Sequence, residues 1–383
     1  MEIQEPLNTS INRPRDHLYL TPFRSVRGLI LVLANLSSAL TVLVFLSPVT
    51  AILVRLFSVH HSRVATSFLF GMWLSLWPFM FEKINNTKVV FSGETVPEKE
   101  RVLIMANHRT EVDWMYLWCL AARKGRLGYV RYVLKSSLMR LPLFGWAFQI
   151  LEFVPVERKW EVDESNMRNM LETYKDPDDP LWLAVFPEGT DFSEQKCIKS
   201  QQFAAEHGLP ILRNVLLPKT RGFYTCLETL RCSIDAVYDV TIAYKHRCPI
   251  FRDIVFGQDP SEVHIHVKRI PLREVPTSET DTAAWLTERF RIKDRLLSDF
   301  GVHGHFPSQG TEGDLSTCKY LAISVGVIAL TCVCVYLTVF TSVWFKIYVV
   351  AVCSYFAFAT YFNVRAPPVL ASVKALCCGT KSV

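Results

Sequence analysis

Four long runs without charged residues constrain this chain more than any other feature of its sequence. They cover residues 28–54, 64–81, 320–345 and 347–364, and an arginine, lysine or glutamate bounds each run. An apolar helix needs about 20 residues to cross a hydrocarbon core of roughly 30 Å, and the first and third runs are long enough. The second and fourth lie near the lower limit, so a buried or re-entrant helix is the alternative for each. The pattern predicts two apolar hairpins that flank a polar central region.

These runs divide the chain into six parts: a polar amino terminus, a membrane hairpin, a central domain, a linker, a second hairpin and a tail. The corresponding ranges are 1–27, 28–81, 82–300, 301–319, 320–364 and 365–383. Arginines in the first part favour a cytoplasmic amino terminus, and two crossings would return the chain to the same side. Arg55 and Arg63, between the first two runs, argue for the opposite orientation. A hairpin that enters only one leaflet reconciles the two signals.

The net charge indicates which partners suit the chain, and the cysteines indicate its redox compartment. The formal net charge of +6 is spread along the chain, which suits an anionic membrane surface and acidic substrates. No basic stripe with interleaved aromatic residues is present, which argues against nucleic-acid binding. The eleven cysteines lack a regular spacing, so the sequence predicts no disulfide framework and indicates a reducing compartment.

The central region alternates short apolar runs with segments of helical periodicity. The runs predict strands at 102–105, 129–134, 153–156, 181–186, 214–217 and 236–243, and an edge strand at 263–270. The periodic segments predict helices at 113–122, 162–174, 193–207 and 282–298. We therefore expect an α/β fold: a mostly parallel sheet flanked by helices, with membrane-embedded helical hairpins at both ends. In such a sheet, active residues lie at the carboxyl ends of strands.

The sharpest chemical motif is the segment from Asn107 to Asp113, which follows the first predicted strand. His108 is the side chain suited to accept a proton near neutral pH. Asp113, five residues later, can reach back to the other ring nitrogen and stabilise the imidazolium form. No serine or cysteine nucleophile occupies a matching turn, so direct attack by an activated alcohol is the simplest chemistry. A structural histidine and a helix-capping aspartate are the alternative.

A second motif, Phe186 to Thr190, lies between a buried strand and a helix. Such a turn exposes backbone N–H groups that suit a phosphate or an oxyanion. Glu188 is placed to orient a substrate hydroxyl, whereas a plain turn shaped by Gly189 and capped by Thr190 is the alternative. Three cations at or near the ends of apolar runs are further phosphate-binding candidates, with solvated surface charge as the default: Lys135, Arg158 and Arg221.

These motifs resemble the glycerolipid acyltransferase family, whose signature is a histidine and an aspartate separated by four residues. Four blocks match in the family's order and together cover about residues 100 to 225: Asn107 to Asp113, Val154 to Arg158, Phe186 to Thr190, and Val215 to Phe223. The last block and the two hairpins resemble the branch that includes plant lysophosphatidate acyltransferases and animal lysocardiolipin acyltransferases.

The resemblance implies a role for each matching residue. His108 would be the general base and Asp113 its partner. Arg158 and the turn of Glu188 and Gly189 would bind the glycerophosphate, and Pro218 would shape the acyl pocket. No metal and no tightly bound cofactor is implied. Asp191 departs from the family, because many members that use phosphatidic-acid precursors have arginine there.

The resemblance also implies the reaction. Acyl-coenzyme A would donate its acyl group to the free hydroxyl of 1-acyl-sn-glycerol 3-phosphate and so form phosphatidic acid. Another lysophospholipid acceptor, such as lysocardiolipin or a lysophosphatidyl-glycerol or -inositol, is one alternative. A lipid hydrolase or a non-enzymatic membrane protein is another. The family further implies an endoplasmic reticulum membrane, with a multi-pass chain and its catalytic domain facing the cytoplasm.

Overall fold

The computed structural model describes residues 20–141, 143–258 and 262–362. These residues include a seven-stranded sheet in the order β1-β7-β6-β2-β5-β3-β4. The strands are β1 (Lys88–Gly93), β2 (Val102–Ala106), β3 (Val130–Lys135), β4 (Val154–Val156), β5 (Trp182–Val185), β6 (Ala236–Tyr244) and β7 (Glu262–Pro271). Strands β6, β2, β5, β3 and β4 run parallel, whereas β7 pairs antiparallel with β6. The expectation of a mostly parallel α/β sheet is confirmed.

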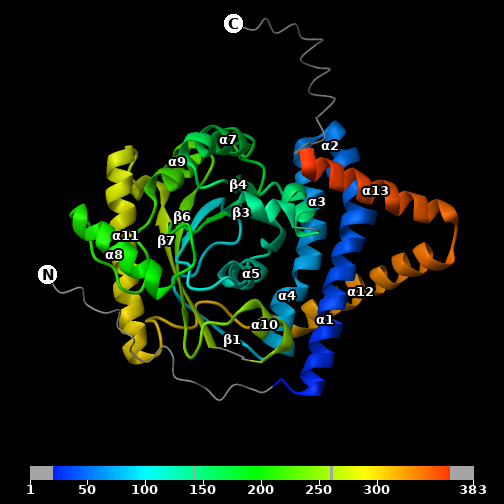
Figure 1. The fold of residues 1–383 in the computed structure, drawn as a ribbon, viewed down its shortest axis with the longest axis horizontal. Coiled ribbons are helices and arrows are strands. Elements are labelled where there is room, and N and C mark those ends of the chain that lie inside the picture. Colours follow the sequence, from blue (N-terminus) through cyan, green and yellow to red (C-terminus); the bar gives the residue numbers. More distant parts are fainter. Residues whose placement is uncertain (1–19, 142, 259–261, 363–383) are drawn as a thin grey trace, which may run out of the picture.

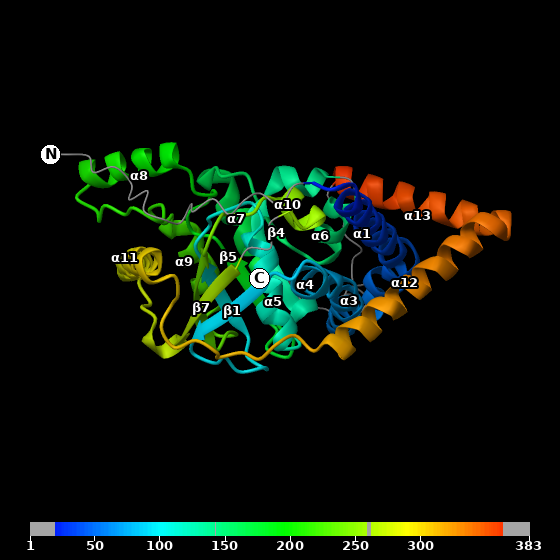
Figure 2. The ribbon, with the colours of Figure 1, turned by 90° about the horizontal axis from the view of Figure 1, so that it is seen from below.

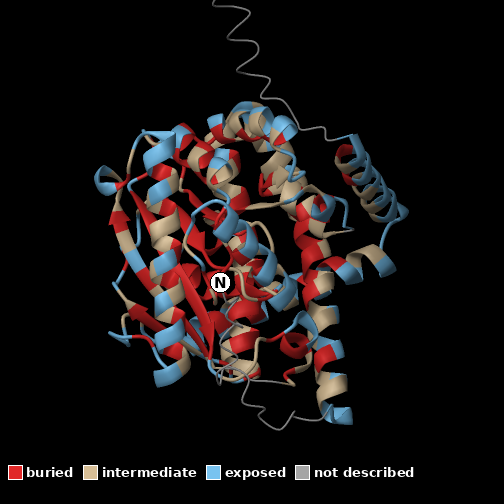
Figure 3. Cartoon of the chain, turned by 60° about the vertical axis from the view of Figure 1, so that its left-hand side comes forward, coloured by how far each residue is buried: buried red, intermediate tan, exposed pale blue. Residues whose placement is uncertain are grey.

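Helices cover both faces of the sheet, as Figure 1 shows. They are α5 (Asp113–Arg123), α6 (Phe144–Ile150), α7 (Trp160–Glu172), α8 (Glu194–Glu206), α9 (Thr220–Leu230), α10 (Phe251–Phe256) and α11 (Glu279–His303). Alternate residues of a strand point to opposite faces, and β2 follows this rule. Ile104 packs in a core with α5 and the apolar helices, whereas Leu103 and Met105 pack in a second core with α7, α9 and α11. The strands are therefore buried on both sides (Figure 3).

Four helices of the described residues are long and apolar enough to cross a membrane. The first begins as α1 (Pro22–Thr41) and continues to Leu46, and the second begins as α3 (Val59–Leu74) and continues through α4 (Leu76–Phe79) to Ile84. The other two are α12 (Thr317–Phe340) and α13 (Val343–Phe362), which project away from the body of the molecule (Figures 1 and 2). Only 11% and 17% of their apolar windows are buried. Their unpartnered apolar surface suits contact with lipid.

Pro48 ends the first of these helices. The chain forms a π-helical turn over Val42–Leu46, and Pro48 then starts a second short helix that runs through α2 (Val54–Phe57). Proline has no N–H and fits the first position of a helix, where that donor has no partner within the helix. The first apolar run therefore gives one long helix and one short helix at the tip of the hairpin.

Two strand predictions were wrong. Residues 214–217 form no strand, because side chains take their backbone donors: the N–H of Asn214 bonds to Asp294 and that of Leu216 to Glu188. Residues 263–270 do form a strand, β7, but it is not at an edge. The unpredicted strand β1 pairs along its outer side and is the edge strand.

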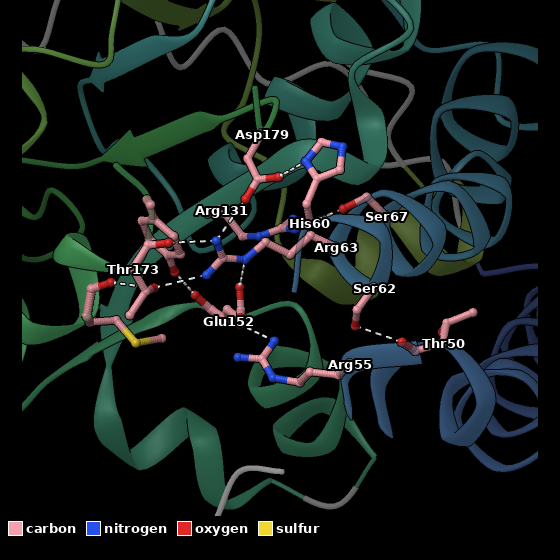
Figure 4. A network of polar contacts seen from close by, with 12 residues as sticks. Thr50, Arg55, His60, Ser62, Arg63, Ser67, Arg131, Glu152, Thr173 and Asp179 are labelled. Atoms are coloured by element: carbon pink, nitrogen blue, oxygen red, sulfur yellow. Dashed lines mark hydrogen bonds and ion pairs between the residues drawn. The ribbon is translucent and has the colours of Figure 1, made fainter. Parts of the chain in front are cut away.

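Ion pairs connect the second apolar helix, and the short helix α2 just before it, to the central domain. At one end, Arg55 and Arg63 bind the two oxygens of the Glu152 carboxylate at 2.8 and 2.7 Å (Figure 4). At the other end, Glu82 binds Arg123 at 2.8 Å. The two arginines that argued against a cytoplasmic amino terminus are thus bound to the domain. Their side chains are only 17% and 10% exposed, so they do not form a free basic loop.

Candidate active site

The first motif lies at the carboxyl end of β2, the central strand of the seven-stranded sheet. Asn107 is buried, and its side-chain amide donates to and accepts from the backbone of Ile242 on β6, at 3.0 and 2.7 Å. These two bonds extend the hydrogen bonding between β2 and β6 by one residue beyond the end of β2, with the Asn107 side chain in place of backbone groups. They place the next residue, His108, where the chain leaves the sheet toward α5.

His108 and Asp113 are in direct contact. The ring Nδ1 of His108 lies 2.9 Å from Oδ2 of Asp113. The same oxygen accepts the N–H groups of Arg109 and Thr110, at 2.5 and 2.8 Å. Asp113 is fully buried and is the first residue of α5, whose N-cap is Val112. The aspartate therefore orients the histidine and the preceding loop instead of capping the helix.

Tyr244, at the end of β6, completes this arrangement. Its hydroxyl donates a hydrogen bond of 2.5 Å to Oδ1 of Asp113. Both carboxylate oxygens are thereby satisfied, as a buried charge requires. The imidazole keeps Nε2 available, since Nδ1 faces the carboxylate, and the ring packs against Phe186 with 4.6 Å between centroids.

The electrostatic surroundings favour the protonated form of His108. Burial of the ring lowers its pKa, but the hydrogen bond to Asp113 and the negative charges of Asp113, Glu188 and Asp191 outweigh burial and raise the pKa above its usual value. Such a ring is a strong proton acceptor at neutral pH.

Glu188 connects the motifs. One of its oxygens accepts the N–H of His108 at 2.8 Å, and the other accepts the N–H of Leu216 at 2.9 Å. The residue is 2% exposed, and burial raises the pKa of its carboxyl to about 7 although both backbone bonds oppose this shift. Its two oxygens therefore brace the loop of His108 against the segment that leads to Pro218.

The side chain of Lys219, a residue that the sequence analysis did not select, lies across the turn that follows Glu188. Gly189 has a φ of +72°, and the Lys219 side chain crosses it so closely that a Cβ at Gly189 would lie 3.2 Å from Nζ. The N–H of Lys219 bonds to the carbonyl of Pro187 at 2.8 Å, which holds buried Pro218 beside the turn. Lys219 is exposed, and within the described residues its ammonium group has no acidic partner.

Asp191 does not present a free negative charge. It accepts hydrogen bonds from Lys196 at 2.8 Å and from the Thr190 hydroxyl at 3.1 Å, and Lys196 also bonds to Thr190. Its side chain is 50% exposed, and although burial opposes the shift, the bonds to Lys196 and Thr190 lower the pKa of its carboxyl. Lys196, in the first turn of α8, therefore compensates the negative charge of Asp191.

The predicted cations follow the other parallel strands. Lys135 is the last residue of β3, opposite Val156 of β4, and Arg158 follows two residues later. Adjacent strands are about 4.8 Å apart, so β3 and β4 lie about 10 and 14 Å from β2 at the same edge of the sheet. Lys135 and Arg158 are exposed, as is Arg221 in the first turn of α9.

Arg158 is held in a backbone conformation that is rare outside glycine, with a φ of +63°. The carboxylate of buried Asp163 accepts the N–H groups of the residues on either side, Glu157 at 2.6 Å and Lys159 at 3.0 Å. These bonds force the chain to turn at Arg158 and direct its side chain away from the core.

The structure thus brings His108, Asp113, Glu188, Gly189 and Pro218 together. Lys135 and Arg158 lie farther along the same edge of the sheet, and Arg221 lies in the first turn of α9. Sequence reasoning missed Tyr244, Lys196 and Lys219. Lys219 was within reach, because it follows Pro218 in a recognised block. Tyr244 was not, because it lies 131 residues from Asp113 and no local spacing relates the two.

Comparison with known proteins identifies relatives over most of the chain. A sequence model named "Acyltransferase" matches residues 88–245, and one named "Acyltransferase C-terminus" matches residues 253–325. Probable 1-acyl-sn-glycerol-3-phosphate acyltransferase 5 of Arabidopsis thaliana is 57% identical over 93% of this chain and 95% of its own. Lysocardiolipin acyltransferase 1 of Gallus gallus is 36% identical over 73% of this chain and 74% of its own. A crystal structure of the acyltransferase PlsC from Thermotoga maritima matches with a TM-score of 0.40 and 16% identity, covering 71% of this chain and 97% of that chain.

Proposed function

Because the chain belongs to the acyltransferase family, we propose that it transfers a fatty acyl group from acyl-coenzyme A to the free hydroxyl of 1-acyl-sn-glycerol 3-phosphate. The products are phosphatidic acid and coenzyme A. The contact between His108 and Asp113, 2.9 Å long, is the observation that carries this proposal. The 57% identity to the Arabidopsis relative over nearly the whole chain supports this acceptor.

The reaction follows from the ring nitrogen of His108 that does not face Asp113. Nε2 of His108 takes the proton of the acceptor hydroxyl as its oxygen attacks the thioester carbon. The carbon–sulfur bond of the tetrahedral intermediate then breaks, and the protonated histidine returns its proton to the leaving thiolate. Asp113 stabilises the imidazolium between these steps, and Tyr244 holds the second oxygen of Asp113. The proton that His108 takes from the hydroxyl thus leaves with the thiol, and the histidine returns to its starting form.

The cations at the carboxyl edge would bind the acceptor phosphate. Lys135 ends β3 and Arg158 follows β4, and these strands lie about 10 and 14 Å from β2; the long side chains would cover the remaining distance to a phosphate held near His108. Lys219 would add a third cation across Gly189. Arg221 begins the neighbouring helix and would act at longer range, and Pro218 would border the acyl chain.

Compensation of Asp191 by Lys196 supports a phosphate monoester as the head group. A free carboxylate beside the Glu188 turn would repel a dianion, but the ion pair of 2.8 Å removes most of that repulsion. Glu188 is then a positioning residue, because its two oxygens are already bonded to backbone N–H groups. The turn at Gly189 and Thr190 contributes backbone geometry near the phosphate.

The proposal extends to the division of the chain and its location. Residues 82–300 would be the catalytic domain, and the hairpins at 28–81 and 320–364 would hold it at the endoplasmic reticulum membrane, facing the cytoplasm. The four long apolar helices support a membrane location. Protease treatment of sealed microsomes should therefore degrade the catalytic domain without detergent. Full protection of the domain would refute this orientation.

The acceptor is tested with membranes that contain the expressed chain, labelled acyl-coenzyme A and a panel of lysophospholipids. Labelled phosphatidic acid should form with lysophosphatidate, and it should be absent for His108→Ala. Preference for lysocardiolipin or another phosphodiester would overturn the acceptor but keep the chemistry. Release of free coenzyme A without any acceptor would indicate hydrolysis and refute transfer.

A further inference from the structure

A cleft lies where the amino-terminal hairpin meets the central domain. It measures about 300 Å³ with its open mouth included, and its lining combines Arg63, Arg101 and Arg131 with Glu152 and Asp179. Figure 4 shows Arg63, Arg131, Glu152 and Asp179 of this lining, with Arg63 between the two carboxylates. Arg101 directly precedes β2, and Arg131 is the second residue of β3. The cleft is therefore at the amino-terminal edge of the sheet.

This edge is opposite the candidate active site. His108 follows the carboxyl end of β2, which has five residues. A strand rises about 3.3 Å per residue, so the first and last residues of β2 lie about 13 Å apart. A molecule in the cleft could not touch the His108 ring, and any ligand of the cleft is distinct from the reacting groups.

The residues that line the cleft carry three positive and two negative charges. Glu152 binds Arg55 and Arg63, and Asp179 binds Arg63 and His60. Arg131 is 5% exposed, and within the described residues its hydrogen bonds go to neutral acceptors, the carbonyls of Gly128 and Val130 and the hydroxyl of Ser67.

Arg101 has a donor left over. The residue is 7% exposed and its Nε and Nη2 bond to the carbonyls of Ser233 and Tyr174. Its Nη1 is buried without a hydrogen-bond partner among the described residues. Asp235 reaches the backbone N–H of Arg101 at 2.8 Å, and Asp176 is exposed to solvent. A buried, charged donor without an acceptor costs free energy, which an anion bound in the cleft would recover.

A second cavity, polar on one side and apolar on the other, adjoins the cleft and shares Arg63, Arg131 and Glu152 with it. It measures about 660 Å³ with its mouth included. Its other walls are partly polar and partly apolar. The polar part comes from Arg55, Ser62, Thr66 and Gln149, and the apolar part from Ala51 and Ile52 at the hairpin tip, Trp146 and Ile150 of α6, and Tyr355, Phe356 and Ala359 of α13. Cationic groups at one end and apolar walls toward α13 match an amphiphile with an anionic head.

We propose that this cleft and cavity bind an anionic phospholipid of the bilayer, with its phosphate at Arg101 and Arg131 and its acyl chains along α13. The site is separate from acyl transfer and does not depend on the proposed function. The apolar walls favour a lipid over a free anion, because a soluble phosphate would leave the cavity unfilled. By binding the hairpin, α13 and the domain together, the lipid stabilises the folded chain through mass action.

The test uses the full chain purified in an uncharged detergent, with thermal unfolding as the readout. Phosphatidylglycerol should raise the unfolding midpoint in a saturable way, and phosphatidylcholine should not. Arg101→Lys, which changes the donor geometry, and Ala359→Phe, which fills the cavity, should each raise the half-saturating lipid concentration about tenfold or more. Arg295→Gln is the control, because the side chain of Arg295 on α11 is 63% exposed. This variant should leave the half-saturating lipid concentration unchanged.

Three results would overturn the proposal. An equal shift with phosphatidylcholine would show that charge plays no part. A shift produced by inorganic phosphate alone would show a site for free anions. If Arg158→Gln abolishes the shift of the unfolding midpoint and Ala359→Phe leaves that shift intact, the lipid binds at the carboxyl edge of the sheet. Ala359→Phe keeps the test decisive should Arg101→Lys fail to fold.

Discussion

The Tyr244 hydroxyl lies 2.5 Å from the Asp113 carboxylate, so a residue at the end of β6 holds the aspartate that contacts His108. Both groups are buried, and the bond occupies the oxygen that the histidine does not face. Asp113 is thereby restrained from two sides. Its position depends on the pairing of β6 with β2 as much as on its own helix.

The variant Tyr244→Phe tests whether the Tyr244 hydroxyl positions Asp113 for catalysis. It removes a hydrogen bond to a charged group, which is typically worth about 1.5–3 kcal/mol, and it leaves an oxygen of Asp113 without a donor. We expect kcat to fall about tenfold with little change in KM, as for an interaction that matters to the transition state. Tyr238→Phe is the matched control, because Tyr238 on the same strand donates to Glu100 at 2.7 Å, away from His108. An equal loss of kcat in both variants would contradict the role of Tyr244.

Removal of the base should abolish transfer. His108→Ala is expected to lower kcat by about 10²–10⁴-fold, and Asp113→Ala should also cause a large loss. The double variant should be little worse than either single one, because coupled residues act as a unit. The measurement is labelled acyl transfer in membranes with equal amounts of expressed protein. Independent, multiplicative losses would argue against one catalytic pair.

The pH profile should report the surroundings of His108. The base acts in its neutral form, and its pKa is raised above the usual value. Activity is therefore present above that pKa and is lost as pH falls through it. In Asp113→Asn the main group that raises the pKa loses its charge, so the inflection of kcat/KM should move to lower pH. An inflection that stays in place or moves up would disprove this source of the shift.

Lys219 should contribute to phosphate binding. Lys219→Ala is expected to raise KM for lysophosphatidate about tenfold while kcat changes little, because loss of a charge-assisted bond weakens ground-state and transition-state binding alike. Lys199→Ala on α8 is the control, since this lysine is exposed and lies outside the motifs. The ratio of kcat/KM for lysophosphatidate to that for lysophosphatidylglycerol should fall in Lys219→Ala only. A parallel fall with both acceptors would show that Lys219 does not recognise the monoester.

Glu152 should make stability depend on pH. Its burial would raise the pKa, but Arg63 and Arg55 lower the pKa of this carboxyl to about 2. The stabilisation is complete above the ordinary pKa of a glutamate and is lost as pH falls from about 4.5 toward 2, at most about 3 kcal/mol. Glu152→Gln should unfold more easily at neutral pH, and its stability should vary less over this acidic range. Denaturant unfolding in detergent at several pH values checks both points.

Local spacing determined the centre of the site. Asp113 follows His108 by five residues across a strand-to-helix turn, so one short segment brings the two side chains together. The long apolar runs determined the helical hairpins in the same way, because their length and composition suffice to form membrane-type helices. Hydrophobic periodicity, also a local property, located strands β2 to β7 and helices α5, α7, α8 and α11. It missed β1, α6, α9 and α10.

Only the tertiary structure decided what each charge does. Asp191 reads as a repulsive carboxylate in the sequence, yet Lys196 compensates it. Arg55 and Arg63 read as a basic loop, yet Glu152 binds both. Residues 214–217 read as a strand, yet carboxylates take their backbone donors. The physical reason is common to all three: the energy of a charge or a donor depends on the partner that folding brings to it, and composition and spacing do not specify that partner.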